Sequence, residues 1–118
     1  MNFSEVLKDA VESVDGAVSA MIIASDGIPV EEYYSQKLLE LSDLGAEASQ
    51  MIKDVENASR ELRIGETREF SIISETCGII LRKIIEGYYF VLVITPEGNY
   101  GKGRFILRRA VPMIEKEF

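Results

Sequence analysis

The sequence predicts an α+β domain in which a five-stranded antiparallel sheet carries helices on both faces. The two longest unbroken apolar runs, Ala17–Ala24 and Tyr88–Ile94, lack the polar alternation of half-buried strands. Such strands must be covered on both faces, so we expect these two side by side at the centre of one sheet. The segments follow the order α-β-β-α-β-β-β-α. If the first and fifth strands are central, the sheet order is 2-1-5-4-3.

The first predicted element is an amphipathic helix at the N-terminus. Apolar residues recur at helical spacing over residues 3–14, and Asn2 followed by Glu5 resembles a capping box. Asp15 and Gly16 end the helix.

A β-hairpin is expected next. The buried strand 17–25 is followed by Asp26 and Gly27, a dipeptide typical of hairpin turns, and by a returning strand over 28–34. Pro29 cannot donate a hydrogen bond to a neighbouring strand, which places this second strand at an edge of the sheet.

The longest element is a middle helix that begins between Gln36 and Ser42 and lasts to about Leu62. Apolar residues at helical spacing carry this prediction. They are Leu41, Leu44, Ala48, Met51, Ile52, Val55, Ala58 and Leu62.

Three further strands, over 66–74, 78–85 and 88–95, are predicted to form a meander because short turn segments separate them. The first of these has the weakest apolar content, with Arg68 and Glu69 beside Phe70. It is therefore predicted at the other edge of the sheet, where it must be blunted, covered or paired with another chain.

The last predicted segments are a glycine-rich loop over 96–103 and a C-terminal helix from Phe105 to Ile114, kinked at Pro112. The glycines of the loop, with Lys102 among them, suggest a phosphate cradle only superficially. Their spacing matches neither the Walker A pattern nor the dinucleotide fingerprint, and a plain strand-to-helix loop explains them.

The composition excludes several classes of function. The chain of 118 residues is expected to be a single domain over residues 1–118, and its 20 acidic and 13 basic residues give a net charge of −7. This balance argues against nucleic-acid binding, which needs a local excess of lysine and arginine. Histidine is absent, so the usual general base and the commonest metal ligand are missing. We expect no catalytic residue, no metal and no cofactor.

The single cysteine and the apolar pattern point to a cytoplasmic protein. Cys77 has no partner for an internal disulfide, and the N-terminal residues lack the pattern of a secretory leader. No apolar run reaches the length that spans a membrane, so membrane insertion is not expected.

Two acidic residues allow a catalytic hypothesis beside a structural one. Asp26 and Glu75 could act as an acid and base pair, but both occupy predicted turns, where such side chains commonly form local hydrogen bonds. The structural interpretation is favoured.

Small residues in the middle helix point to a contact surface. Glycine inside a helix costs about 1 kcal/mol relative to alanine, so a close approach at Gly45 is a plausible compensation. One hypothesis places Gly45, Ser49 and Ile52 on a stripe that contacts another molecule. The other is that one broad apolar face covers the sheet and that the small residues let the helix lie close to it.

The element order, the hairpin residues 26–30 (DGIPV) and the closing segment 99–110 (NYGKGRFILRRA) resemble the Roadblock/dynein light-chain family, a profilin-like fold. Within that segment, residues 104–112 most resemble the bacterial MglB-like branch. The resemblance covers nearly the whole chain.

The resemblance implies a homodimer without enzymatic activity that binds a Ras-like small GTPase of the MglA type and stimulates its GTP hydrolysis. In the family, two sheets join through their third strands and the middle helices form a platform for the GTPase. Carried onto this chain, the strand pairing involves Arg68, Phe70 and Ile72. The platform residues are Leu44, Gly45, Ala48, Ser49 and Ile52.

Two other functions remain as alternatives. One is a scaffold or adaptor of the same fold that leaves GTP hydrolysis unchanged. The other is a small-molecule sensor, which would need a roomy pocket between sheet and helix.

Overall fold

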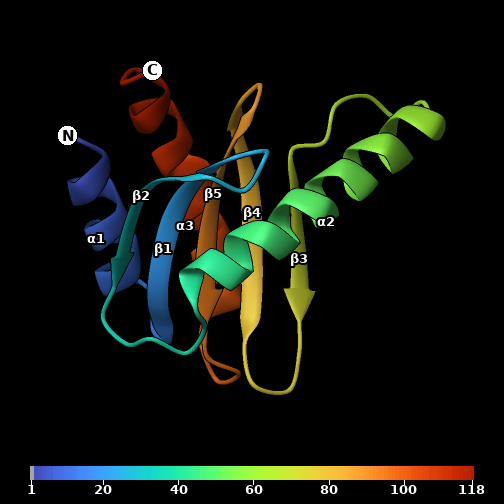
Figure 1. Cartoon of the computed structure of the whole chain (residues 1–118). Coiled ribbons are helices and arrows are strands. Elements are labelled where there is room, and N and C mark those ends of the chain that lie inside the picture. Colours follow the sequence, from blue (N-terminus) through green and yellow to red (C-terminus); the bar gives the residue numbers. More distant parts are fainter. Residues whose placement is uncertain (1) are drawn as a thin grey trace.

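The structure, a computed structural model, describes residues 2–118 and has the predicted order of three helices and five strands (Figure 1). The elements are α1 (Phe3–Ser13), β1 (Ala17–Ala24), β2 (Pro29–Tyr34), α2 (Leu41–Glu61), β3 (Glu69–Ile73), β4 (Gly78–Ile85), β5 (Tyr88–Ile94) and α3 (Tyr100–Glu115).

The five strands form one antiparallel sheet in the order β2-β1-β5-β4-β3, as predicted. The two apolar strands β1 and β5 lie side by side at its centre, with Met21 opposite Val91. The strand that begins at Pro29 and the weakly apolar β3 are the two edges.

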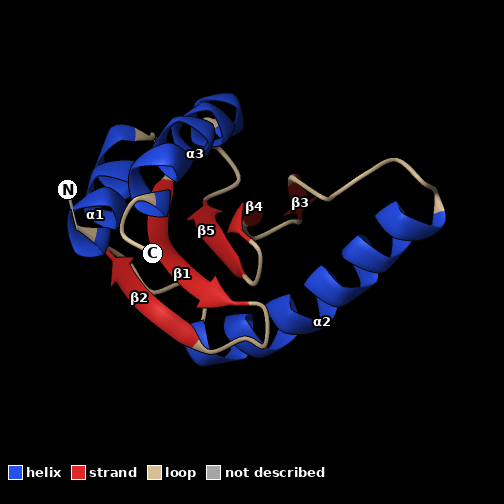
Figure 2. Cartoon of the chain, turned by 90° about the horizontal axis from the view of Figure 1, so that it is seen from above, coloured by secondary structure: helices blue, strands red, loops and turns tan. Residues whose placement is uncertain are grey.

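Helices cover both faces of the sheet (Figure 2). Helices α1 and α3 lie on one face and α2 lies on the other, and each face has its own core because β1 and β5 present apolar side chains alternately to both. The core under α1 and α3 includes Leu7, Ile22, Ile80, Phe90, Leu92 and Leu107. The core under α2 includes Met21, Ile23, Ile52, Leu81, Tyr89 and Val91.

Helix α2 crosses the sheet obliquely, and its C-terminal half extends beyond β3 (Figure 1). It begins at Leu41, inside the predicted window, and Leu62 caps its end. Helix α2 has five buried residues, and all of them except Ile52 lie in its first half. The second half therefore depends on polar contacts with the sheet.

The start of α3 differs from the prediction. The helix begins at Tyr100, so two of the glycines expected in a loop lie within its first turn. The side chain of Asn99 accepts a hydrogen bond from the backbone N–H of Lys102 at 2.9 Å and caps the helix. Gly103 is buried, and a Cβ atom there would meet Ile94 at 2.7 Å. The helix also continues through Pro112.

None of the helices in residues 2–118 combines the length and the apolar character needed to cross a membrane.

Candidate interaction face

The edge strand β3 offers unpaired backbone groups on its outer side. Lys83 donates its backbone N–H to the carbonyl of Arg68 at 2.9 Å, and Ser74 donates to the carbonyl of Cys77 at 3.0 Å. Residues of an antiparallel strand point their backbone groups alternately toward and away from the neighbouring strand. The groups of Phe70 and Ile72 therefore bond to β4. Those that face the open edge belong to Glu69, Ser71 and Ile73.

This register shows where the backbone groups of the predicted pairing residues bond. Arg68, Phe70 and Ile72 were expected to pair with another chain, but their backbone groups belong to the ladder with β4. The sequence contains no signal for which of the two alternating sets of β3 residues directs its backbone groups outward, because that depends on the register between β3 and β4.

The side chains along β3 present apolar surface on both faces of the sheet. Phe70 packs edge-on against Tyr89 on the α2 face, with ring centroids 6.2 Å apart. On the opposite face Ile73 is 60% exposed, which is a large fraction for an isoleucine in a strand.

A groove of about 330 Å³ runs between the first half of α2 and strands β3 and β4. Its walls are mainly apolar and its rim carries three carboxylates. The apolar residues are Leu39, Leu44, Met51, Ile72 and Ile79, and the carboxylates are those of Glu40, Asp43 and Glu47. Such a surface suits a protein partner that brings both apolar and basic side chains.

The five predicted platform residues contact the protein's own fold. Leu44, Ala48 and Ile52 are 5%, 0% and 1% exposed and belong to the core under α2. Of these three, only Ile52 was expected on the outward stripe, and its burial removes it from that stripe.

Gly45 and Ser49 contact the β1–β2 hairpin. A Cβ atom on Gly45 would lie 2.5 Å from the carbonyl oxygen of Gly27, and one on Gly27 would lie 2.6 Å from that of Gly45 and 3.4 Å from Ser49. Gly27 also has a φ of +93°, which favours glycine. The small residues therefore let the helix approach the β1–β2 turn closely, whereas the second hypothesis expected them to let it approach the sheet.

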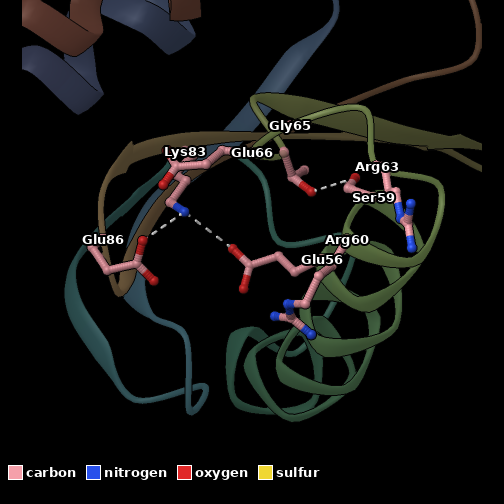
Figure 3. Close-up of a pocket in the computed structure, with 9 residues that line it drawn as sticks. Glu56, Ser59, Arg60, Arg63, Gly65, Glu66, Lys83 and Glu86 are labelled. Atoms are coloured by element: carbon pink, nitrogen blue, oxygen red, sulfur yellow. Dashed lines mark hydrogen bonds and ion pairs between the residues drawn. The ribbon is translucent and has the colours of Figure 1, made fainter.

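A polar network attaches the second half of α2 to the sheet (Figure 3). The buried hydroxyl of Tyr89 in β5 donates to a carboxylate oxygen of Glu56 in α2 at 2.7 Å. Lys83 in β4 places its Nζ atom 3.4 Å from the same carboxylate and 2.9 Å from that of Glu86. Sequence reasoning missed this network, since its members lie on three separate elements.

The network shifts two pKa values. Burial and then the hydrogen bond to Glu56 raise the pKa of Tyr89 far above its ordinary value. Partial burial works against the charge of Lys83, but the hydrogen bonds and charges of Glu86 and Glu56 outweigh it and raise its pKa. Both groups therefore hold their protons more firmly in the folded protein.

Beside this network an open cleft of about 480 Å³ separates the end of α2 from the sheet (Figure 3). Three carboxylates and three basic side chains line it, together with Ser59 and Thr67, whose hydroxyl oxygens lie 2.8 Å apart. The charges largely compensate one another, and the cleft presents no excess of either sign.

Asp26, one of the two turn residues considered for catalysis, has a local structural role. The Asp26 carboxylate accepts a hydrogen bond from the backbone N–H of Ile28 at 3.1 Å, which is the local role predicted for a turn. Cys77 is 7% exposed and belongs to the core under α2.

No model of a known protein family matches the sequence, and no curated protein matches it. Solved structures do. MglC from Myxococcus xanthus shares 30% sequence identity with the chain, and the match covers 100% of each chain with a TM-score of 0.73.

Two further structures match the fold more closely at lower identity. The gliding protein MglB from Thermus thermophilus is 20% identical, with 96% of this chain and 85% of that chain covered and a TM-score of 0.87. A Roadblock/LC7 domain from Streptomyces avermitilis is 13% identical, with 96% and 94% covered and a TM-score of 0.85.

Proposed function

Because the chain belongs to the Roadblock/LC7 family, we propose that it is a homodimeric regulator that binds a Ras-like small GTPase of the MglA type and stimulates its GTP hydrolysis. The observation that carries this proposal is the apolar groove with a carboxylate rim beside an open strand edge. The regulator acts by protein contact and contributes no catalytic side chain of its own.

The second copy of the chain occupies the β3 edge. Outward backbone groups at Glu69, Ser71 and Ile73 can continue the antiparallel ladder, and the exposed Ile73 side chain would be covered. A solved structure of MglB, 20% identical to this chain, is described as having a tetrameric arrangement, which supports assembly as a property of related proteins.

The GTPase occupies the groove. In our proposal α2 remains the platform, but the residues that line the groove make the contact in place of the buried Ala48 and Ile52. Asp43 and Glu47 at the rim attract basic side chains of the partner, while the apolar walls supply the buried area.

Measuring GTP turnover by an MglA-type GTPase from the same organism tests this function. We expect the protein to accelerate hydrolysis by roughly tenfold or more, with a factor below that of an inserted arginine finger. The variant Asp43→Lys with Glu47→Lys should lose most of the acceleration, because it reverses the charge of the groove rim.

Glu12→Lys on the exposed surface of α1 is the matched control and should behave as the wild type. Light scattering checks that each variant keeps the oligomeric state of the wild type. If the wild-type protein neither forms a complex with the GTPase nor accelerates its GTP hydrolysis, the proposal is contradicted.

Because the chain matches MglC as well as MglB, a second candidate stands beside the first, an adaptor of the same fold. An adaptor would bind the GTPase through the same groove and leave hydrolysis unchanged. Binding measured by calorimetry with no change in turnover would select this candidate.

The sensor hypothesis finds less support. A sensor needs an enclosed cavity between the sheet and its helices, but Ile22, Val91 and Val93 there are at most 1% exposed and closely packed. The clefts described within residues 2–118 are open and lie along the margins of α2, β2 and β3.

A further inference from the structure

A cluster of arginines lies at the start of β3 around a single glutamate. Arg82 in β4 places its Nη1 atom 3.1 Å from one carboxylate oxygen of Glu69, and Arg104 in α3 places its Nε atom 2.6 Å from the other. The Glu69 side chain is 10% exposed. Both of its oxygens are thus occupied by arginines that come from different elements on the same face of the sheet.

The cluster retains positive charge after these contacts. Arg68 lines the same open hollow of about 670 Å³, next to Arg82, Arg104 and Glu66. Arg68 is exposed and takes part in none of the ion pairs found in residues 2–118. Three arginines therefore face two glutamates, a local positive excess in a chain whose net charge is −7.

A carboxylate without a partner lies at the other end of the same strand. Glu75 occupies the short turn between β3 and β4 that the hydrogen bond from Ser74 to Cys77 closes. Its side chain is exposed, and the ion pairs described for residues 2–118 do not include it.

A second copy of the chain that pairs at the open edge would bring these two ends of β3 close together. If two β3 strands pair antiparallel about Ser71, the middle residue, then Glu69 lies opposite the partner's Ile73. The partner's Glu75 then lies two residues further on, beside the segment that leads into β3. The arginine cluster borders that segment, and the two-fold symmetry repeats the arrangement at the other end.

We propose that Glu75 of each copy binds the arginine cluster of the other, with Arg68 as its principal partner. This inference rests on the homodimer of the proposed function and names the contact that sets its register. A strand edge alone allows pairing at several registers, because backbone hydrogen bonds carry little sequence information. Opposite charges at both ends of a five-residue strand favour the register that joins them and disfavour slipped ones.

Charge reversal tests the pair without the GTPase. Sedimentation equilibrium measures the dimer dissociation constant. We expect Glu75→Arg and Arg68→Glu each to weaken the dimer by roughly tenfold or more, since each places like charges together at two symmetric positions. The double variant restores the pair with its charges exchanged, so its dissociation constant returns toward that of the wild type.

Glu12→Arg in α1 changes the net charge by the same amount as Glu75→Arg, far from the edge, and is the matched control for that variant. Raising the salt concentration should weaken the wild-type dimer more than the Glu75→Gln dimer. A dimer whose dissociation constant is unchanged by both reversals overturns the pair and leaves the homodimer intact. A wild-type chain that remains monomeric overturns both.

Cross-linking gives a second readout that does not depend on energies. In a Cys77→Ser background, Arg68→Cys with Ser74→Cys should form disulfide-linked dimers under mild oxidation, because these two positions lie directly opposite each other when the strands pair about Ser71. Within one chain the two positions are separated by about 20 Å of extended strand, too far for a disulfide. The absence of linked dimers at concentrations where the dimer forms contradicts the proposed register.

Discussion

Tyr89 fixes the position of the part of α2 that the apolar core does not reach. Its ring lies in the core and its hydroxyl donates to Glu56, 33 residues away in the sequence. A buried hydroxyl without a partner would cost about 1–3 kcal/mol, so the contact favours the observed helix position over nearby ones. Lys83 holds the same carboxylate from a second strand.

The raised pKa values predict a loss of stability in alkali. Below the ordinary pKa of tyrosine, both the folded and the unfolded chain keep the proton of Tyr89. As the pH rises above about 10, the unfolded chain releases this proton while the folded chain retains it, so the free energy of unfolding falls. Lys83 acts in the same direction.

Urea unfolding of Tyr89→Phe checks this expectation. The variant should lose about 1–2 kcal/mol near neutral pH, where the hydrogen bond to a charged group is removed, and its stability should fall less steeply between about pH 9 and 11. Tyr34→Phe, at an exposed tyrosine, is the control. If the free energy of unfolding fell equally with pH in Tyr89→Phe and in the wild type, Tyr89 would not be the source of the loss of stability in alkali.

At the scale of the element, β3 is the strand whose pairing distinguishes a monomer from an assembly. Ser71→Pro removes an N–H that points to the open edge and leaves the ladder to β4 intact. We expect this variant to be a folded monomer by light scattering, while Ser71→Ala, which keeps the N–H, remains a dimer. A Ser71→Pro dimer would place the contact between copies elsewhere.

The sequence predicted the elements better than their faces. Strands β1 and β5 could be placed at the centre because their apolar runs have no polar interruption, and Pro29 indicated an edge. The outward-facing stripe on α2 was wrong for Ile52, because a helix that crosses a sheet obliquely buries a broader face than a straight stripe predicts.

The groove and the outward groups of β3 could not be read from the sequence. They depend on the register between β3 and β4 and on the angle at which α2 crosses them. The early start of α3 has a local signal, since Asn99 is a favourable N-cap residue, but the following glycines outweighed it. The burial of Gly103 against Ile94 is a tertiary effect.

At the scale of the whole molecule, an assembly through β3 links stability to concentration. A partner that binds only the folded state raises the unfolding temperature by mass action. For a dimer of this size, a hundredfold rise in protein concentration should raise Tm by about 5 °C. Scanning calorimetry of the wild type beside Ser71→Pro measures this shift, and a wild-type Tm that is independent of concentration would argue for a monomer.

The contact between Gly27 and Gly45 also restricts how this sequence can diverge. Each glycine occupies the space that a methyl group on the other would need, because either Cβ atom would meet a carbonyl oxygen across the contact. The residue at each of these two positions therefore restricts which residue can stand at the other. A hairpin that drifts away from α2 could release Gly45, whereas Gly27 would still be restricted by its φ of +93°.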